Sequence, residues 1–180
     1  MTLRALLILS LIVAAVSFYA TLCSGQCSED RGDVKTATDR SLFIRVPIFV
    51  TLGDLSRLSM HTVRHNTPRE PREQQEYTVK ATLVGYKAES DGDFHLVIQD
   101  SGRTMIIEAV NPGCAKSSPL FSQIETVRTV ITGALNPTAT YRHCKIPIMV
   151  TGLLFEDFGH GQTGVADNFL ELHPLVSIGF

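Results

Sequence analysis

Apolar and polar residues alternate strictly over residues 77–83, where every second side chain from Tyr77 to Leu83 is apolar. A period of two is typical of a β-strand that buries one face. The sequence that follows predicts four more strands, over residues 94–99, 104–110, 146–155 and 169–178. An Asp-Gly hairpin signal at residues 90–93 separates the first two strands, and residues 100–102 form the next turn.

One helix is predicted between the third and fourth strands. Its apolar face repeats at helical spacing and consists of Leu120, Phe121, Ile124, Val127, Val130 and Ile131. Ser118 supplies an N-cap, Pro119 occupies the first helical position and Gly133 marks the end. The order β-β-β-α-β-β therefore predicts a mainly β fold with one helix, an OB-like five-stranded barrel. A five-stranded sheet with the helix packed on one face is the alternative.

The first 25 residues predict export. Arg4 gives a short positive start, residues 5–22 carry no charge, and residues 23–25 are small. This is the pattern of a signal peptide that is cleaved before Gln26. An uncleaved membrane anchor and a lipoprotein modified at Cys23 are the alternatives. We therefore expect a periplasmic or extracellular protein, or one that is anchored at the outer face of the cytoplasmic membrane.

An N-terminal extension over residues 26–76 precedes the predicted OB-like domain at residues 77–180. Within it, the apolar stretch Leu42–Val50 contains Pro47, which predicts an edge strand or an extended segment. Thr51, with an acidic residue three positions later, predicts a capping box and a short helix. Residues 59–76 mix charges without a period, so we expect a solvated polar connector.

The composition and the net charge indicate the class of the protein and the kind of partner that it binds. Of the 180 residues, 44% are hydrophobic and 19% are charged, as in an ordinary globular domain. The net charge of −2 lacks the basic surplus of a protein that binds phosphate backbones. We therefore expect a protein, a small molecule or a glycan as the ligand rather than nucleic acid, with membrane contact at the N-terminus as a further option.

Two of the four cysteines lie inside the predicted domain. Cys114 and Cys144 bracket the predicted helix. In an oxidising compartment such a pair predicts a disulfide. Two buried free thiols are the alternative.

The predicted strands place polar side chains on one outer face. If Leu96 fills the core, then its neighbour His95 faces outward, as does Gln99. The turn at residues 90–93 and the Gly-rich loop (residues 156–168) meet at one end of an OB-like barrel. The candidate ligand face consists of Asp91, Asp93, His95, Gln99, Glu108, Asp157, His160, Gln162 and His173.

Three interpretations of this face remain open. Asp93, His95, His160 and His173 are the candidate ligands of a metal-dependent hydrolase. No metal motif matches their spacing, however, and Asp-Gly-Asp is first of all turn chemistry, so we expect no metal and no cofactor. A nuclease-like enzyme is the second alternative, because the turn resembles that of the staphylococcal nuclease family, although residues 110–113 lack that family's acidic residues. In the third interpretation, the polar loops only cap the barrel, and His173 forms a hydrogen bond with a backbone group.

Four sequence motifs are spread over the mature chain. They are Asp91-Gly92-Asp93-Phe94-His95-Leu96-Val97, Thr104-Met105-Ile106-Ile107-Glu108, His160-Gly161-Gln162-Thr163-Gly164-Val165-Ala166 and Glu171-Leu172-His173-Pro174-Leu175. In these motifs the chain resembles an uncharacterised family of small secreted bacterial proteins. The resemblance implies export and an independent domain, and it brings no activity with it. The sequence thus favours an exported binding or interaction module over an enzyme, with its contact on the outer face or at Leu42–Val50.

Overall fold

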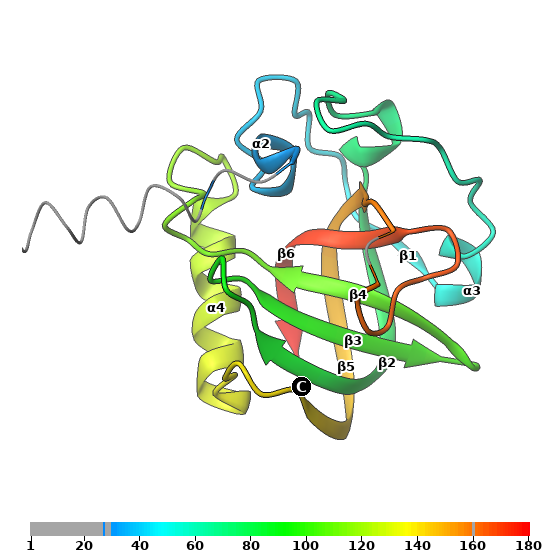
Figure 1. The fold of residues 1–180 in the computed structure, drawn as a ribbon, viewed down its shortest axis with the longest axis vertical. Helices are drawn as coiled ribbons and strands as arrows, with labels where there is room; N and C mark the ends of the chain where they lie inside the picture. Colours follow the sequence, from blue (N-terminus) through cyan, green and yellow to red (C-terminus); the bar gives the residue numbers. More distant parts are fainter. Residues whose placement is uncertain (1–26, 28–29, 160) are drawn as a thin grey trace, which may run out of the picture.

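The computed structural model describes residue 27, residues 30–159 and residues 161–180. The elements, in chain order, are α2 (Gly32–Lys35), β1 (Ile48–Val50), α3 (Leu52–Leu55), the 3-10 helix η1 (Pro71–Gln74), β2 (Glu76–Ala88), β3 (Phe94–Asp100), β4 (Arg103–Ala109), α4 (Phe121–Leu135), β5 (Arg142–Glu156) and β6 (Leu170–Gly179) (Figure 1). The fold is mainly β with one main helix, as predicted. The predicted signal segment and His160 lie outside the described residues.

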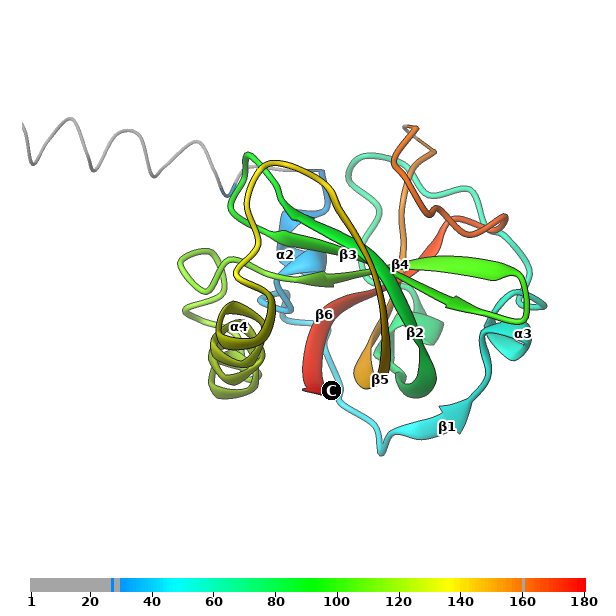
Figure 2. The ribbon, with the colours of Figure 1, turned by 90° about the horizontal axis from the view of Figure 1, so that it is seen from below.

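The six strands form one mixed sheet in the order β1-β2-β3-β4-β6-β5. Because β2 also pairs with β5, the last five strands of that order close into a ring of pairings. β1 lies outside this ring and pairs with β2 in parallel. Figure 2 shows β1, and the chain that leads into it, on the outer side of β2 and β5. Among the described strands, the other edge of β1 has no partner.

The apolar positions of the strands fill the core as the alternation predicts. Leu96 and Ile98 of β3 are fully buried, as is Ile107 of β4. Val127 and Ile131 of α4 join the same cluster. The burial of these side chains is the main source of stability, at roughly 1.5–3 kcal/mol for each fully buried large apolar side chain.

The predicted capping box is confirmed at the start of α3. The Thr51 hydroxyl accepts a hydrogen bond from the Asp54 amide at 3.1 Å, and the Asp54 carboxylate accepts one from the Thr51 amide at 2.9 Å. The N-cap of α4, in contrast, is Leu120 rather than Ser118. Ser118 still serves the helix start, because its hydroxyl accepts a hydrogen bond from the Leu120 amide at 3.2 Å.

The predicted disulfide between Cys114 and Cys144 is wrong. Cys114 is bonded to Cys27, which is 87 residues away in sequence. Cys144 is a free thiol that donates to the Leu83 carbonyl at 3.4 Å, because β5 carries it alongside β2 and away from the loop after β4. A disulfide is typical of an oxidising compartment. Among the described residues, no helix is long and apolar enough to cross a membrane.

The expectation of a solvated connector is also wrong at several charged positions. Arg69 and Glu73 are buried, as is Arg31 further upstream. Glu73 forms an ion pair with Arg31, and Arg69 forms one with Asp39 at 2.7 Å. The Glu73 carboxylate also accepts a hydrogen bond from the Glu156 amide at the end of β5. The extension is therefore folded against the sheet.

Candidate functional site

A buried group of imidazoles and carboxylates lies on the outer face of β3, β4 and β6. We call it the His–carboxylate centre, and it consists of Asp93, His95, Glu108, Glu171 and His173. Alternation explains its position, since His95 flanks the core residue Leu96 and Glu108 flanks Ile107. The antiparallel register sets His95 directly opposite Glu108. Side-chain exposure is 0% for both imidazoles and 3% for Glu108.

The expectation that this face is open to solvent is wrong. Asp93, His95, Glu108, Asp157 and His173 are all buried, whereas Gln99 is exposed and Asp91 and Gln162 are half-buried. Strand alternation assigns a residue to a face, but it does not show what covers that face. In this structure, two segments that are distant in sequence cover it.

The Gly-rich loop is the first cover. The Thr163 carbonyl lies 3.0 Å from His95 Nε2. Gly164 has a positive φ of 89°, and a Cβ atom at this position would clash with the Val97 side chain. The loop is therefore in direct contact with β3 at a point where only glycine fits.

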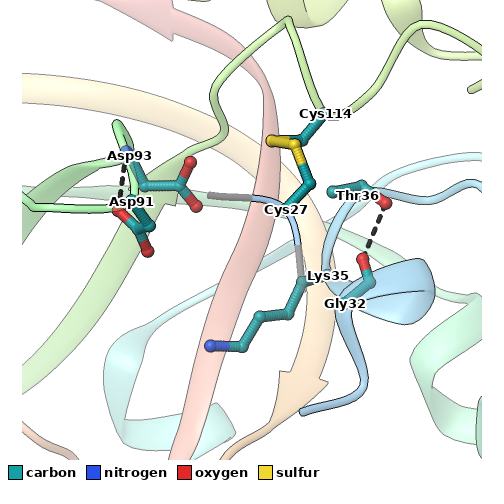
Figure 3. A pocket seen from close by; sticks show the side chains of 7 residues that line it. All are labelled: Cys27, Gly32, Lys35, Thr36, Asp91, Asp93 and Cys114. Atoms are coloured by element: carbon teal, nitrogen blue, oxygen red, sulfur yellow. Dashed lines mark hydrogen bonds between the residues drawn. A yellow bond between two sulfur atoms is a disulfide. The ribbon is translucent and has the colours of Figure 1, made fainter. Parts of the chain in front are cut away.

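The N-terminal extension is the second cover. Lys35 of α2 lines a small cavity together with Asp91 and Asp93 of the turn before β3. The disulfide between Cys27 and Cys114 closes another side of this cavity. Figure 3 shows the carboxylate of Asp93 directed into the cavity. Its volume is about 20 Å³, which is enough for roughly one water molecule.

Glu108 connects the two imidazoles of the centre. Its Oε1 atom is 3.1 Å from His95 Nδ1, and its Oε2 atom is 3.3 Å from His173 Nδ1. Asp93 Oδ2 lies 3.5 Å from His173 Nε2, while Glu171 Oε2 lies 3.8 Å from His173 Nδ1. Within the described residues, neither nitrogen of His173 makes a hydrogen bond. The predicted bond from His173 to a backbone group is therefore not formed.

These surroundings shift the protonation of both imidazoles. Burial works to lower the pKa of His173, but the nearby carboxylates of Asp93, Glu171 and Glu108 raise that pKa to about 10. Burial likewise opposes the charged form of His95, whose pKa is nevertheless raised by Glu108 and the Thr163 carbonyl. Both imidazoles therefore favour the protonated form.

The two buried glutamates of the centre shift in opposite directions. Burial raises the pKa of Glu171 to about 7, against the attraction of His173. Burial also works to raise the pKa of Glu108, but hydrogen bonding to His95 and the charges of His173 and Lys35 hold it below its ordinary value. Such a centre can hold protons or a cation.

Sequence reasoning missed part of this arrangement. Lys35 and Glu89 were not predicted as site residues, although Glu89 Oε1 lies 3.8 Å from His95 Nδ1. Glu171 shares the outer face of β6 with His173, as their spacing of two predicts. No local signal places Lys35 of the extension near the centre.

A second notable surface surrounds β1. We call it the apolar surface, and it consists of Phe43, Ile44, Val46, Ile48, Phe49, Met149 and Phe180, which are 40–85% exposed. Two shallow grooves adjoin it. One, of about 320 Å³, is lined by Phe49 and Val50, and the other, of about 390 Å³, by Met149 and Phe180. Lys80 of β2 lines both grooves, which places β1 and the end of β6 on one continuous surface.

No protein-family model matches the chain, and no curated protein matches it either. The resemblance to small secreted bacterial proteins therefore stays a prediction. The function has to be argued from the two surfaces described above.

Proposed function

We propose that the chain is an exported interaction module that binds a partner protein through the apolar surface. One observation carries the proposal: five large apolar side chains within the seven residues Phe43–Phe49 are exposed, from 40% at Ile44 to 85% at Val46. Contiguous exposed apolar residues on a soluble domain usually mark an interaction site.

β1 supports a particular mode of binding. Its outer edge has no partner among the described strands, and an unpaired edge can accept an extended segment of another protein. Phe49 is 68% exposed beside that edge and can contact the alternate side chains of an added strand. Pro47, just before β1, limits the length of such pairing.

The outer face of β3 and β4 is a weaker candidate for ligand binding. Its imidazoles and carboxylates already contact one another and the two covering segments. The cavity beside Asp93 holds only about one water molecule, so it does not favour a hydrolase acting on a larger substrate. The apolar surface, by contrast, is open.

The proposed module is an OB-like barrel. Three features support this assignment: the pairing order β2-β3-β4-β6-β5, the return pairing of β5 with β2, and the position of α4 between β4 and β5. The parallel contact between Ile107 of β4 and Leu172 of β6 fits the same topology. β1 is then an addition outside the barrel.

Export is part of the proposal. The uncharged stretch at residues 5–22 has the composition of a signal peptide. Cleavage before Gln26 would keep Cys27, which forms the disulfide with Cys114. Formation of that bond requires the oxidising conditions that an exported protein meets.

Site-specific photo-crosslinking in cells tests the proposed interaction. A photoreactive amino acid at Phe49 should give one discrete crosslinked protein, whereas the same group at the exposed residue Gln99 of β3 should not. The substitutions Phe43→Ser and Phe49→Ser should remove a crosslink formed from position 46. Equal crosslinking from positions 49 and 99, or crosslinks to lipid alone, would contradict the proposal.

A further inference from the structure

We propose that the His–carboxylate centre binds one divalent transition-metal ion, with Asp93, Glu108 and His173 as its protein ligands. One ligand atom from each of these residues lies within 4.8 Å of the others. They come from the turn before β3, from β4 and from β6, so the paired strands fix their relative positions. This proposal does not depend on the apolar surface or on any partner protein.

The imidazole of His173 provides the first reason. It is fully buried, and neither ring nitrogen has a hydrogen-bond partner within the described residues. Buried polar atoms are almost always paired with a donor, an acceptor or an ion. Nδ1 faces Glu108 at 3.3 Å and Nε2 faces Asp93 at 3.5 Å. An ion bound to one ring nitrogen and to these oxygens would leave the other nitrogen to donate its proton to a neighbouring carboxylate, so that both nitrogens are satisfied.

The charge of the centre provides the second reason. Four carboxylates surround the two imidazoles, namely those of Glu89, Asp93, Glu108 and Glu171. Lys35 is a cation whose charge acts on Glu108. His95 is a second cation when both of its nitrogens donate, as its two acceptors, Glu108 and the Thr163 carbonyl, require. Glu89 is itself paired with Lys87 at 3.0 Å, so Asp93, Glu108 and Glu171 are the carboxylates that surround His173. A divalent ion that replaces the proton of His173 would be held by these carboxylates, because unpaired buried charges are costly.

The ligand atoms indicate the class of metal. An imidazole nitrogen with carboxylate oxygens suits zinc and similar transition metals, whereas calcium requires six to eight oxygen ligands. The cavity of about 20 Å³ beside Asp93 (Figure 3) has room for a water molecule as a further ligand.

His95 then positions a ligand. It donates to Glu108 Oε1 at 3.1 Å, which leaves Glu108 Oε2 directed toward His173. Metal-binding carboxylates are commonly held by such second hydrogen bonds, and their removal weakens binding about 10–100-fold. The Thr163 carbonyl of the Gly-rich loop fixes the other side of the His95 ring.

Calorimetric titration of the chelator-treated mature protein with Zn²⁺ tests the proposal. We expect one ion per chain and a rise in melting temperature when Zn²⁺ is added. Glu108→Gln and His173→Asn should abolish the binding, and His95→Gln should weaken it about 10–100-fold. His143→Asn, at an exposed histidine of β5, is the matched control and should bind as the unaltered protein does.

Two outcomes would overturn the proposal. One is the absence of Zn²⁺ binding and of any thermal shift in the unaltered protein, a measurement that needs no variant. The other is binding that survives both Glu108→Gln and His173→Asn, since the ion would then sit elsewhere. Circular dichroism checks that each variant is folded. If the two buried variants unfold, Asp93→Asn, at the most exposed of the three ligands, takes their place and should also abolish binding.

Discussion

Arg31 and Glu73 form an ion pair in which both side chains are fully buried, with the two closest atoms 2.5 Å apart. The guanidinium also donates to the Glu156 carbonyl at 2.8 Å, so one side chain joins the extension, η1 and the end of β5. Removal of one partner of a buried pair leaves the other charge without compensation. This relationship gives the first prediction.

Glu73→Gln should lower the free energy of unfolding by about 3–5 kcal/mol, as is usual when a buried ion pair is broken. Urea denaturation measures the change. Arg57→Met provides the control, because it breaks an exposed pair with Asp54 and should cost no more than about 1 kcal/mol. Similar losses in the two variants would mean that Arg31 and Glu73 are accessible to solvent.

The disulfide between Cys27 and Cys114 gives the second prediction. The two cysteines are 87 residues apart in sequence, so the bond closes a long loop. For a loop of this length the chain-entropy model gives a stabilisation of roughly 4–5 kcal/mol. Cys114→Ser should therefore lower stability strongly, whereas Cys144→Ser, at a free thiol, should cost much less. Peptide mapping of the non-reduced protein should find residues 27 and 114 in one linked species. A linked species containing Cys144 would contradict this assignment.

Neighbouring positions on β3 give the third prediction. Leu96→Ala leaves a cavity in the core and should cost roughly 2–5 kcal/mol. His95→Ala should also be costly, at about 1–3 kcal/mol or more, because it removes a buried hydrogen-bonding group and leaves Glu108 without that partner. Gln99→Ala, at an exposed position of the same strand, should change stability by no more than about 0.5 kcal/mol. A negligible loss at His95 would mean that the Gly-rich loop does not cover it.

The ion pair of Asp39 and Arg69 gives a prediction for the stability of the fold at acidic pH. Burial works to raise the pKa of Asp39, but the hydrogen bonds and charge of Arg69 hold it below the ordinary 3.8. Below pH 3.8 the unfolded chain therefore binds more protons at this position than the folded chain. The stabilisation is complete above pH 3.8 and is lost as the pH falls through the lowered pKa.

Urea denaturation from about pH 5 to about pH 2 measures this effect. Asp39→Asn should be less stable than the unaltered protein at the upper end of the range, and the difference should shrink toward the lower end. A difference between the two proteins that is independent of pH would show that Asp39 does not titrate as described.

Local patterns predicted the part of the fold that depends on neighbouring residues. The alternation around Leu96 identified the core face, and Thr51 with Asp54 identified the start of α3. The order of the strands and the single helix followed from the same periodicities. In each case the signal and the structure lie within a few residues of each other.

The candidate site was predicted less well, because it depends on residues that are far apart in sequence. Alternation correctly predicted that the His95 side chain lies on the face opposite the core. It could not predict that Thr163, 68 residues later, covers this side chain. The positions of Cys114 and Cys144 on either side of the predicted helix favour a bond between them, whereas the partner of Cys114 is Cys27 of the extension. Arg69 and Glu73 looked solvated because their partners, Asp39 and Arg31, are more than two dozen residues upstream.

The long separations in the extension also bear on the order of folding. Arg31 donates to the carbonyl of Glu156, 125 residues further along the chain. Contacts of this kind close large loops, and a high proportion of them slows folding. A chain that emerges N-terminus first therefore presents Arg31 long before residue 156 is available to accept its hydrogen bond. The segment that is synthesised early must wait for β5 before it can dock.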